Sequence, residues 1–456
     1  MSIKRSVSAF LAAVMIFATV ISVVSCDIAV DEDESNGTSS STGSNVAESR
    51  DETDTEISTQ IDTETGVDTT ETGTEKVTEP YIENSPFENA NMNFSVELFK
   101  EVIDARKDND SIMISPLSVM IALAMTANGA SGETLEDMED VLGMPRDLLN
   151  EALKSYVASL PSADKYKLML ANSIWMRDNG LTVEEKFLEK VYAFYASEPY
   201  TELFDATTVD KINAWVDENT DGMINKLIDE ISDETMLFLI NAVCFDAMWS
   251  DPYDDRQVRD GEFANATGEV KSVKMMYSEE GMYIENDDAV GFIKNYRRGY
   301  SFVAILPKDA AMPIYDYIDS LDPEELRDMI KNSESIRVNA ALPQFRSEYT
   351  VRMDRMLTNM GMDNCFIGQG ADFSAMGSSD RGPLAISQVL HKTFIEVTQY
   401  GTRAAAVTSV AMDAEGEVIG EIKNVTLDRP FVYMIIDNSA KLPIFMGAVT
   451  DIEYEY

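Results

Sequence analysis

Apolar residues recur at helical spacing in three stretches of the first half of the chain. They lie three and four positions apart, so each stretch would have one apolar face and one polar face as a helix. The second stretch follows Ser115-Pro116, and a proline suits the first turn of a helix because the N–H it lacks would have no partner there. The pattern predicts helices at residues 94–99 with their continuation, 117–128 and 209–219.

Short runs of β-forming apolar residues dominate the second half of the chain. They are bounded by turn-favouring residues such as Pro307, Asn438 and Pro443. These runs predict strands at residues 301–306, 431–436 and 444–449. Helices and strands do not alternate regularly along the chain, which favours an α+β fold over an α/β fold.

A charge-poor run of small residues between Gly401 and Pro430 predicts a loop that can become a strand. No proline or glycine interrupts residues 402–414, so every residue keeps its backbone donor. With a period of two, one face carries Thr402, Ala404, Ala406, Thr408, Val410 and Met412, and the other carries Arg403, Ala405, Val407, Ser409, Ala411 and Asp413. We expect the face of Thr402 to be buried and the face of Arg403 to stay solvated. An ordinary surface strand or the end of an alanine-rich helix would give the same local pattern.

The composition narrows the choice of partners. The chain has 456 residues, of which 45% are hydrophobic, and its formal net charge is −45. Such a charge disfavours nucleic acid and anionic membrane surfaces as partners. Residues 27–85 are rich in Ser, Thr, Asp and Glu and contain only two basic residues, Arg50 and Lys76. We therefore expect a disordered linker there, either a spacer or only a solubilising tail.

The N-terminus has the pattern of an export signal. Lys4 and Arg5 precede an apolar stretch at residues 9–24, and residues 23–26 (VVSC) resemble the bacterial lipobox, in which the cysteine becomes lipidated. A plain signal peptide and an uncleaved anchor helix are the alternatives. The sequence thus predicts a signal peptide at 1–25, a lipidated Cys26 with its linker at 26–85, and one globular domain at 86–456. We expect an extracellular or cell-surface lipoprotein that contacts the membrane only through its lipid.

Residue counts speak against an enzyme. His391 is the single histidine, so a metal site with several histidines is impossible, and no nucleophile elbow or glycine-rich phosphate loop is present. Abundant carboxylates supply no geometry for a glycosidase. The cysteines Cys26, Cys244 and Cys365 form no disulfide framework, and Cys244 lies in an apolar run typical of a buried residue. The sequence indicates no cofactor and no metal.

Two blocks near the C-terminus identify a family resemblance. Residues 385–397 (AISQVLHKTFIEV), followed by Gly401-Thr402 and the alanine run, resemble the proximal hinge of serpins. Residues 425–435 (VTLDRPFVYMI) resemble the C-terminal serpin signature. The resemblance extends over residues 86–456 through shorter matches, namely ISPLS at 114–118, NGA at 128–130, ANSIW at 171–175, INAWV at 212–216, LPQF at 342–345 and ADFS at 371–374.

The resemblance implies a serpin fold with three β-sheets, about nine helices and an exposed reactive-centre loop. It also implies a monomeric inhibitor of serine or cysteine proteases. The protease cleaves the loop and forms an acyl-enzyme, and the loop then inserts into the main sheet and deforms the trapped protease. The implied hinge comprises Gly401, Thr402, Arg403, Ala404, Ala405, Ala406, Val407 and Thr408.

The usual hinge length places the reactive bond between Glu415 and Gly416. The loop is longer than is typical, which leaves Met412, Ala414, Val418 and Ile419 as alternative positions of the cut. A Glu before the cut indicates a glutamyl-specific protease, whereas the apolar neighbours suit elastase-like or subtilisin-like enzymes. Trypsin-like targets are disfavoured because the tip has no basic residue before Lys423.

The resemblance also assigns residues that control conformation. Four polar residues match the cluster beneath the point where the central strands part, and one tryptophan matches the entry point of the loop; they are Ser115, Ser118, Asn241, His391 and Trp249. Plain core packing is the alternative for each. Gln399, Tyr400 and Arg403 depart from the hinge of inhibitory serpins. A non-inhibitory serpin-fold binding protein that is cleaved as a substrate is therefore the second hypothesis.

Overall fold

The computed structural model describes residues 85–104, 110–161, 166–178, 180–197, 199–366, 370–403 and 421–453. All of them belong to one compact unit, Lys76–Tyr456. Several sites expected from the sequence lie outside the described residues, namely Cys26, Ala404, Ala405, Ala406, Val407, Thr408, Met412, Ala414, Glu415, Gly416, Val418 and Ile419.

Nine α-helices lie in the described part of the chain. They are α2 (Pro86–Asp104), α3 (Pro116–Ala127), α4 (Gly132–Leu142), α5 (Arg146–Ser159), α6 (Glu185–Tyr195), α7 (Ala206–Asn219), α8 (Ile314–Asp319), α9 (Pro323–Lys331) and α10 (Asp354–Met360). The three helices predicted from apolar spacing are confirmed as α2, α3 and α7. The Asp205 carboxylate begins α7 by accepting hydrogen bonds from the N–H groups of Thr207 and Thr208.

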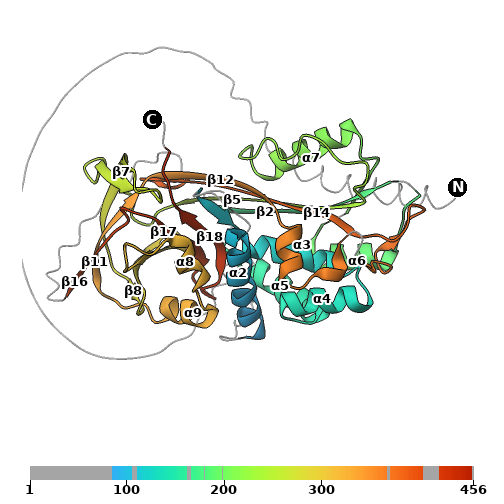
Figure 1. Ribbon diagram of the computed structural model, residues 1–456, viewed down its shortest axis with the longest axis horizontal. Coiled ribbons are helices and arrows are strands. Elements are labelled where there is room, and N and C mark those ends of the chain that lie inside the picture. The colour runs from blue at the N-terminus through green and yellow to red at the C-terminus, as the bar shows by residue number, and fades with distance from the viewer. Residues whose placement is uncertain are drawn as a thin grey trace, which may run out of the picture. The chain divides into compact units, whose positions relative to one another are not determined.

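The main sheet has the strand order β12-β14-β15-β5-β2-β4. Its strands are β12 (Phe345–Arg352), β14 (Ile386–Thr398), β15 (Gly401–Thr402), β5 (Leu237–Met248), β2 (Tyr166–Arg177) and β4 (Tyr200–Glu202). Helix α7 packs on one face of this sheet, and α2 and α3 lie on the other side (Figure 1). A second hydrophobic core, separate from the main one, fills the space beneath α7.

Two further large sheets complete the α+β fold. A six-stranded sheet has the order β1 (Ile112–Ile114), β18 (Pro443–Val449), β17 (Phe431–Asp437), β10 (Tyr300–Pro307), β9 (Ala289–Asn295) and β8 (Tyr283–Glu285). A four-stranded sheet has the order β16 (Ile422–Thr426), β11 (Arg337–Pro343), β7 (Val270–Glu280) and β6 (Val258–Ala264). A small two-stranded sheet pairs β13 (Gly377–Ser378) with β3 (Thr182–Val183).

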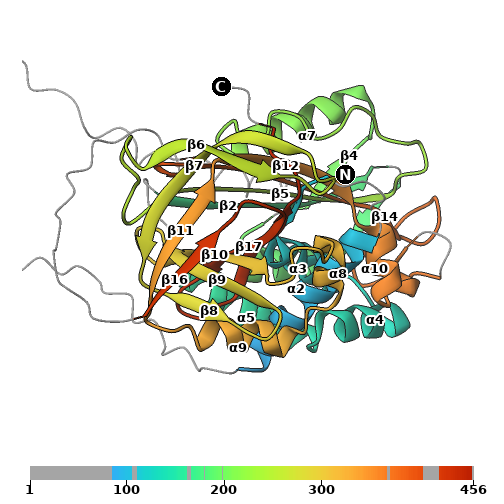
Figure 2. The same ribbon diagram turned by 60° about the vertical axis from the view of Figure 1, so that its left-hand side comes forward.

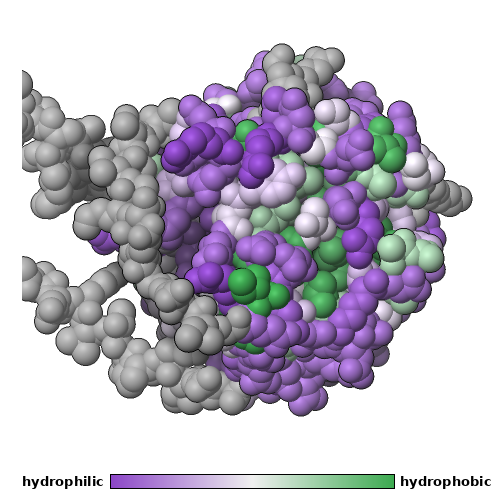
Figure 3. Space-filling model, turned by 90° about the vertical axis from the view of Figure 1, so that its left-hand side faces the viewer, coloured by the Kyte–Doolittle hydropathy of each residue, from purple (hydrophilic) through white to green (hydrophobic). Residues whose placement is uncertain are grey.

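The three strands predicted from sequence are confirmed as β10, β17 and β18, which are neighbours in the six-stranded sheet. Every residue of these strands is buried, because the sheet is covered on both faces. Figure 2 shows the four-stranded sheet beside it, where β7 and β16 contact β9. The face that carries the four-stranded sheet is mainly hydrophilic, with hydrophobic residues gathered near its middle (Figure 3).

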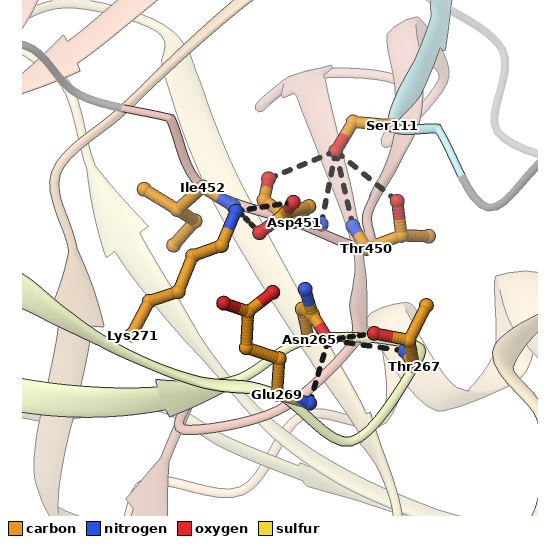
Figure 4. Close-up of polar contacts among 8 residues, drawn as sticks. All are labelled: Ser111, Asn265, Thr267, Glu269, Lys271, Thr450, Asp451 and Ile452. Carbon is orange, nitrogen blue, oxygen red and sulfur yellow. Dashed lines mark hydrogen bonds and ion pairs between the residues drawn. The ribbon is translucent and has the colours of Figure 1, made fainter.

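The last described segment of the chain is held by side chains from two distant regions (Figure 4). The Ser111 hydroxyl accepts the N–H groups of Thr450 and Asp451 at 3.0 and 3.4 Å and lies 3.1 Å from the Asp451 carbonyl. Lys271 of β7 forms an ion pair of 2.6 Å with Asp451. None of the helices in the ranges given above is long and apolar enough to cross a bilayer.

Candidate functional site

The central strands of the main sheet part at one end. Strands β5 and β14 run parallel and pair directly from Leu237 and Ile386 to Cys244 and Phe394. Beyond that point β15 lies between them and pairs antiparallel with both, because Thr402 faces Val397 on one side and Ala247 on the other. The start of the predicted hinge is therefore already a strand with two neighbours.

This geometry favours the entry of more residues. Antiparallel ladders are slightly more stable per residue than parallel ladders. A longer β15 would break the direct parallel pairing of β5 with β14 and form two antiparallel ladders in its place. The short strand β15 would thus become a full-length central strand with additional backbone hydrogen bonds.

Gly401 is required where the chain enters the sheet. Its φ is +152°, and a Cβ atom there would lie 2.1 Å from the carbonyl oxygen of Ala247. No side chain fits at that distance, and L-residues rarely adopt this backbone conformation. Glycine therefore permits the close approach of the hinge to β5.

Thr402 is fully buried, as the alternation of the sequence predicted for its face. Its hydroxyl lies 2.6 Å from the hydroxyl of Tyr296. The Trp249 ring stacks on Tyr296 with centroids 4.3 Å apart, and its indole N–H donates to the carbonyl of Thr398 at 2.9 Å. Trp249 thus lies beside the hinge. Tyr296 was not predicted from the sequence, because it directly follows β9, a strand of another sheet.

Arg403 marks the last described residue before the loop. Its φ is 48°, and its N–H donates to the carbonyl of Glu396 at 2.7 Å. The sequence alternation placed its charge in solvent, but the side chain is partly buried, with the guanidinium 5.8 Å from the centroid of the Phe394 ring. Within the described residues, the Nη1 atom of Arg403 is buried without a hydrogen-bond partner.

The four polar residues expected beneath the parting point do come together. Nε2 of His391 accepts the backbone N–H of Ser115 at 3.0 Å, so the proton of the neutral ring lies on Nδ1 and is donated to Oδ1 of Asn241. The amide of Asn241 donates to the Ser118 hydroxyl and to Asn172. His391 and Asn241 are direct cross-strand partners on β14 and β5.

Two details of this cluster differ from the sequence prediction. Ser115 contributes its backbone N–H, while its hydroxyl is buried without a partner among the described residues. Asn172 of β2 is an additional member, since its Oδ1 accepts from Ser118 at 2.9 Å. The motif that contains Asn172, ANSIW, was recognised in the sequence. The motif did not indicate that Asn172 would contact Ser118 and Asn241.

Burial determines the charge state of His391. The ring is fully buried, and this lowers the pKa of His391 from 6.5 to about 3. The imidazole is therefore neutral at physiological pH and holds its hydrogen bonds to Ser115 and Asn241 in one tautomer.

The other candidate chemical groups are inert in their surroundings. Cys244 and Cys365 are buried free thiols, and burial raises the pKa of each to about 12. Thiols with such pKa values are poor nucleophiles at neutral pH. No group of three or more His, Cys, Asp or Glu side chains within the described ranges has the arrangement of a metal site.

Comparison with known proteins gives concordant matches. Residues 89–452 match the family model described as serpin (serine protease inhibitor). An uncharacterised serpin-like protein of Thermococcus kodakarensis is 31% identical over 379 residues, which covers 80% of this chain and 85% of that protein. Antichymotrypsin-2 of Bombyx mori is 29% identical over 366 residues, covering 76% and 94% of the two chains.

Solved structures agree with these matches. The thermophilic serpin tengpin in its native state superposes with a TM-score of 0.78 and 44% identity, covering 82% of this chain and 96% of that one. Tengpin in its latent state gives a TM-score of 0.72 and 41% identity, covering 82% and 100%.

Proposed function

The chain belongs to the serpin family, and from this we propose that it inhibits serine-type endopeptidases as a suicide substrate. A target protease attacks the reactive loop and forms an acyl-enzyme through its own nucleophile. The freed loop then inserts between β5 and β14 as a new central strand and carries the protease along. Deformation of the protease active site stops hydrolysis of the acyl bond. The inhibitor itself supplies no catalytic group.

One observation carries this proposal: β15 already pairs with both β5 and β14. The register continues toward His391 and Asn241, so the loop can extend β15 once Arg403 changes from its left-handed to an extended backbone. Inserting roughly a dozen residues at about 1 kcal/mol net per hydrogen bond would release on the order of 10 kcal/mol. That free energy is comparable to the stability of a typical folded domain, which supports distortion of a trapped enzyme.

The relatives support the same reading. Antichymotrypsin-2 carries the name of a protease inhibitor. Tengpin has been solved in a native and a latent state, so a serpin with 41–44% identity to this chain adopts two conformations. We extend this conformational freedom to the present chain.

We propose Glu415-Gly416 as the reactive bond, with Met412, Ala414, Val418 and Ile419 as the alternative positions before the cut. The residues around it favour glutamyl, elastase-like or subtilisin-like proteases. The absence of Arg and Lys between Arg403 and Lys423 disfavours trypsin-like targets.

We also propose that Cys26 carries a lipid and holds the inhibitor at the cell surface through the acidic linker. Expression of the full chain in a bacterium tests this. The Cys26→Ser variant should move from the membrane fraction to the soluble exported fraction, while Cys365→Ser, which changes a buried cysteine, should leave the distribution unchanged. Equal distribution of wild type and Cys26→Ser would refute the lipid anchor.

A panel of the three protease classes tests the inhibitory function. The protein is mixed with each protease, resolved on denaturing gels, and the released C-terminal peptide is weighed. A denaturant-resistant complex is expected with at least one class, and the peptide mass identifies the reactive bond. Cleavage by every class without a complex, and without a rise in the thermal stability of the cleaved protein, would favour the non-inhibitory binding protein.

A further inference from the structure

Charged residues form an alternating row across the main sheet on both sides of the slot, by which we mean the gap between β5 and β14 that β15 enters. Lys167 of β2 is the cross-strand partner of Asp246 of β5. On the other side, Glu396 of β14 is the partner of Arg346 of β12. From β2 to β12 the charges are positive and negative on one side of the slot, then negative and positive on the other.

All four side chains belong to the face of the sheet that α7 covers. Cys244, two residues from Asp246, and Phe394, two residues from Glu396, lie in the hydrophobic core beneath α7. Side chains two residues apart in a strand share a face, and cross-strand partners do as well. The two acidic residues therefore border the slot on the same face.

The register places Arg403 between these acids. Thr402 faces Ala247 and Val397, so continuing β15 by one residue brings Arg403 opposite Asp246 and Glu396. The main chain has already reached this register on one side, because the N–H of Arg403 donates to the carbonyl of Glu396 at 2.7 Å. An inserted Arg403 would complete a row in which every charge has opposite neighbours.

Before insertion Arg403 lies near this row but does not have the backbone of a strand. Arg403 has a left-handed backbone with φ of 48°, and its Nη1 atom is buried without a partner among the described residues. Asp246 is partly buried, which raises its pKa, while Arg403 and Lys167 act in the opposite direction and Asp221 adds to the rise. A backbone change at Arg403 from the left-handed to the extended region would bring the guanidinium into line with the row.

We propose that Arg403 is a positioning residue for loop insertion, and that the row Lys167–Asp246–Arg403–Glu396–Arg346 draws the hinge into the slot and fixes its register. This inference rests on the proposed inhibitory function. A slip of one residue would turn the arginine to the other face of the sheet, into the main hydrophobic core, where an unpaired charge is costly. The arginine that departs from the family pattern thus has an acidic partner on each neighbouring strand.

Insertion kinetics of the full-length protein test the proposal. The loop is cut by a protease from the panel, and the rate of the rise in thermal stability is followed at low and high NaCl. Arg403→Gln should slow insertion about fivefold at low salt, the size expected for one partly buried charge pair. Wild type should slow toward the rate of the variant as salt rises, because salt screens the row.

Three matched variants separate positioning from mere packing. Arg403→Lys keeps the charge and should restore most of the rate. Asp246→Asn should also slow insertion, but less than Arg403→Gln, because Glu396 still attracts the arginine. The double variant should be no slower than Arg403→Gln, since that variant has already lost the pair with Asp246.

The outcomes are distinct. If the wild type and Arg403→Gln insert at the same rate and with the same salt dependence, the proposed charge row is refuted. The proposed inhibitory function is not affected by that result. A cleaved wild type that gains no stability would overturn the proposed function, and the positioning role would fall with it.

Discussion

Gly401 occupies a place in the sheet that no other residue type fits. Replacement by alanine would set a Cβ atom 2.1 Å from the Ala247 carbonyl and force an L-residue to a φ of +152°. Because such backbone strain costs roughly 1–3 kcal/mol, β15 should leave the slot in the Gly401→Ala variant.

We expect this variant to lower the urea midpoint of the uncleaved protein and to increase the hydrogen exchange of Thr402. Gly281→Ala is the matched control, since no atom lies within 4 Å of the Cβ position at Gly281. Equal exchange at Thr402 in both variants would contradict the assigned role of Gly401.

His391 links stability to pH because it is the single histidine and is held neutral by burial. Its folded pKa of about 3 lies below the ordinary value of 6.5, so the unfolded chain binds a proton first as the pH falls. The contribution of the neutral His391 ring to stability is therefore fully present above pH 6.5 and is lost progressively as the pH falls toward 3. Between pH 6.5 and pH 4 the loss should be roughly 3 kcal/mol.

Urea unfolding of wild type and His391→Gln across this pH range measures the effect. The two curves of unfolding free energy against pH should converge as the pH falls. Protonation of carboxylates destabilises both proteins, whereas the cost of protonating His391 falls on the wild type alone. Parallel curves would show that the neutral buried imidazole makes no contribution to acid sensitivity.

Among the contacts between elements, the Ser111 hydroxyl is one of two side-chain anchors of the segment after β18, and Lys271 is the other. Ser111→Ala removes the acceptor for the N–H groups of Thr450 and Asp451, and Thr450 is fully buried. A buried donor left without a partner costs about 1–3 kcal/mol, so this variant should be less stable by that amount.

Hydrogen exchange at Thr450 and Asp451 should increase along with the loss of stability. The ion pair from Lys271 remains in the variant and should keep the segment in place. Ser159→Ala, which removes only a local bond to the Tyr156 carbonyl at an exposed helix end, should change the stability little. Unchanged exchange at Thr450 in Ser111→Ala would contradict the anchoring role.

At the scale of the whole molecule, the net charge of −45 should govern encounter with proteases. A cationic protease should associate fastest at low ionic strength, and its association rate constant should fall about tenfold or more at high NaCl. An anionic protease of the same cleavage specificity should show the opposite trend. A variant without residues 27–85 measures how much of the salt dependence comes from the charge of the linker. Association rates that do not change with salt for either protease would exclude electrostatic steering.

Part of the local structure and the family could be predicted from the sequence alone. Apolar spacing predicted α2, α3 and α7, and β-forming runs predicted β10, β17 and β18, because these patterns depend on neighbouring residues along the chain. The period of two also predicted which face of the hinge is buried, as Thr402 confirms. Residue blocks at the hinge and near the C-terminus identified the serpin family, which the family comparison then matched over residues 89–452.

Contacts between residues that are distant in the sequence could not be predicted in this way. Tyr296 meets Thr402, Asn172 joins the cluster around His391, and Asp246 and Glu396 border the position of Arg403 through strand pairings between distant parts of the chain. Alternation assigned Arg403 to a solvated face, but Arg403 is partly buried there, with its guanidinium over the Phe394 ring. A local pattern gives the face of a strand, whereas the cross-strand register and the packing of other elements give its partners.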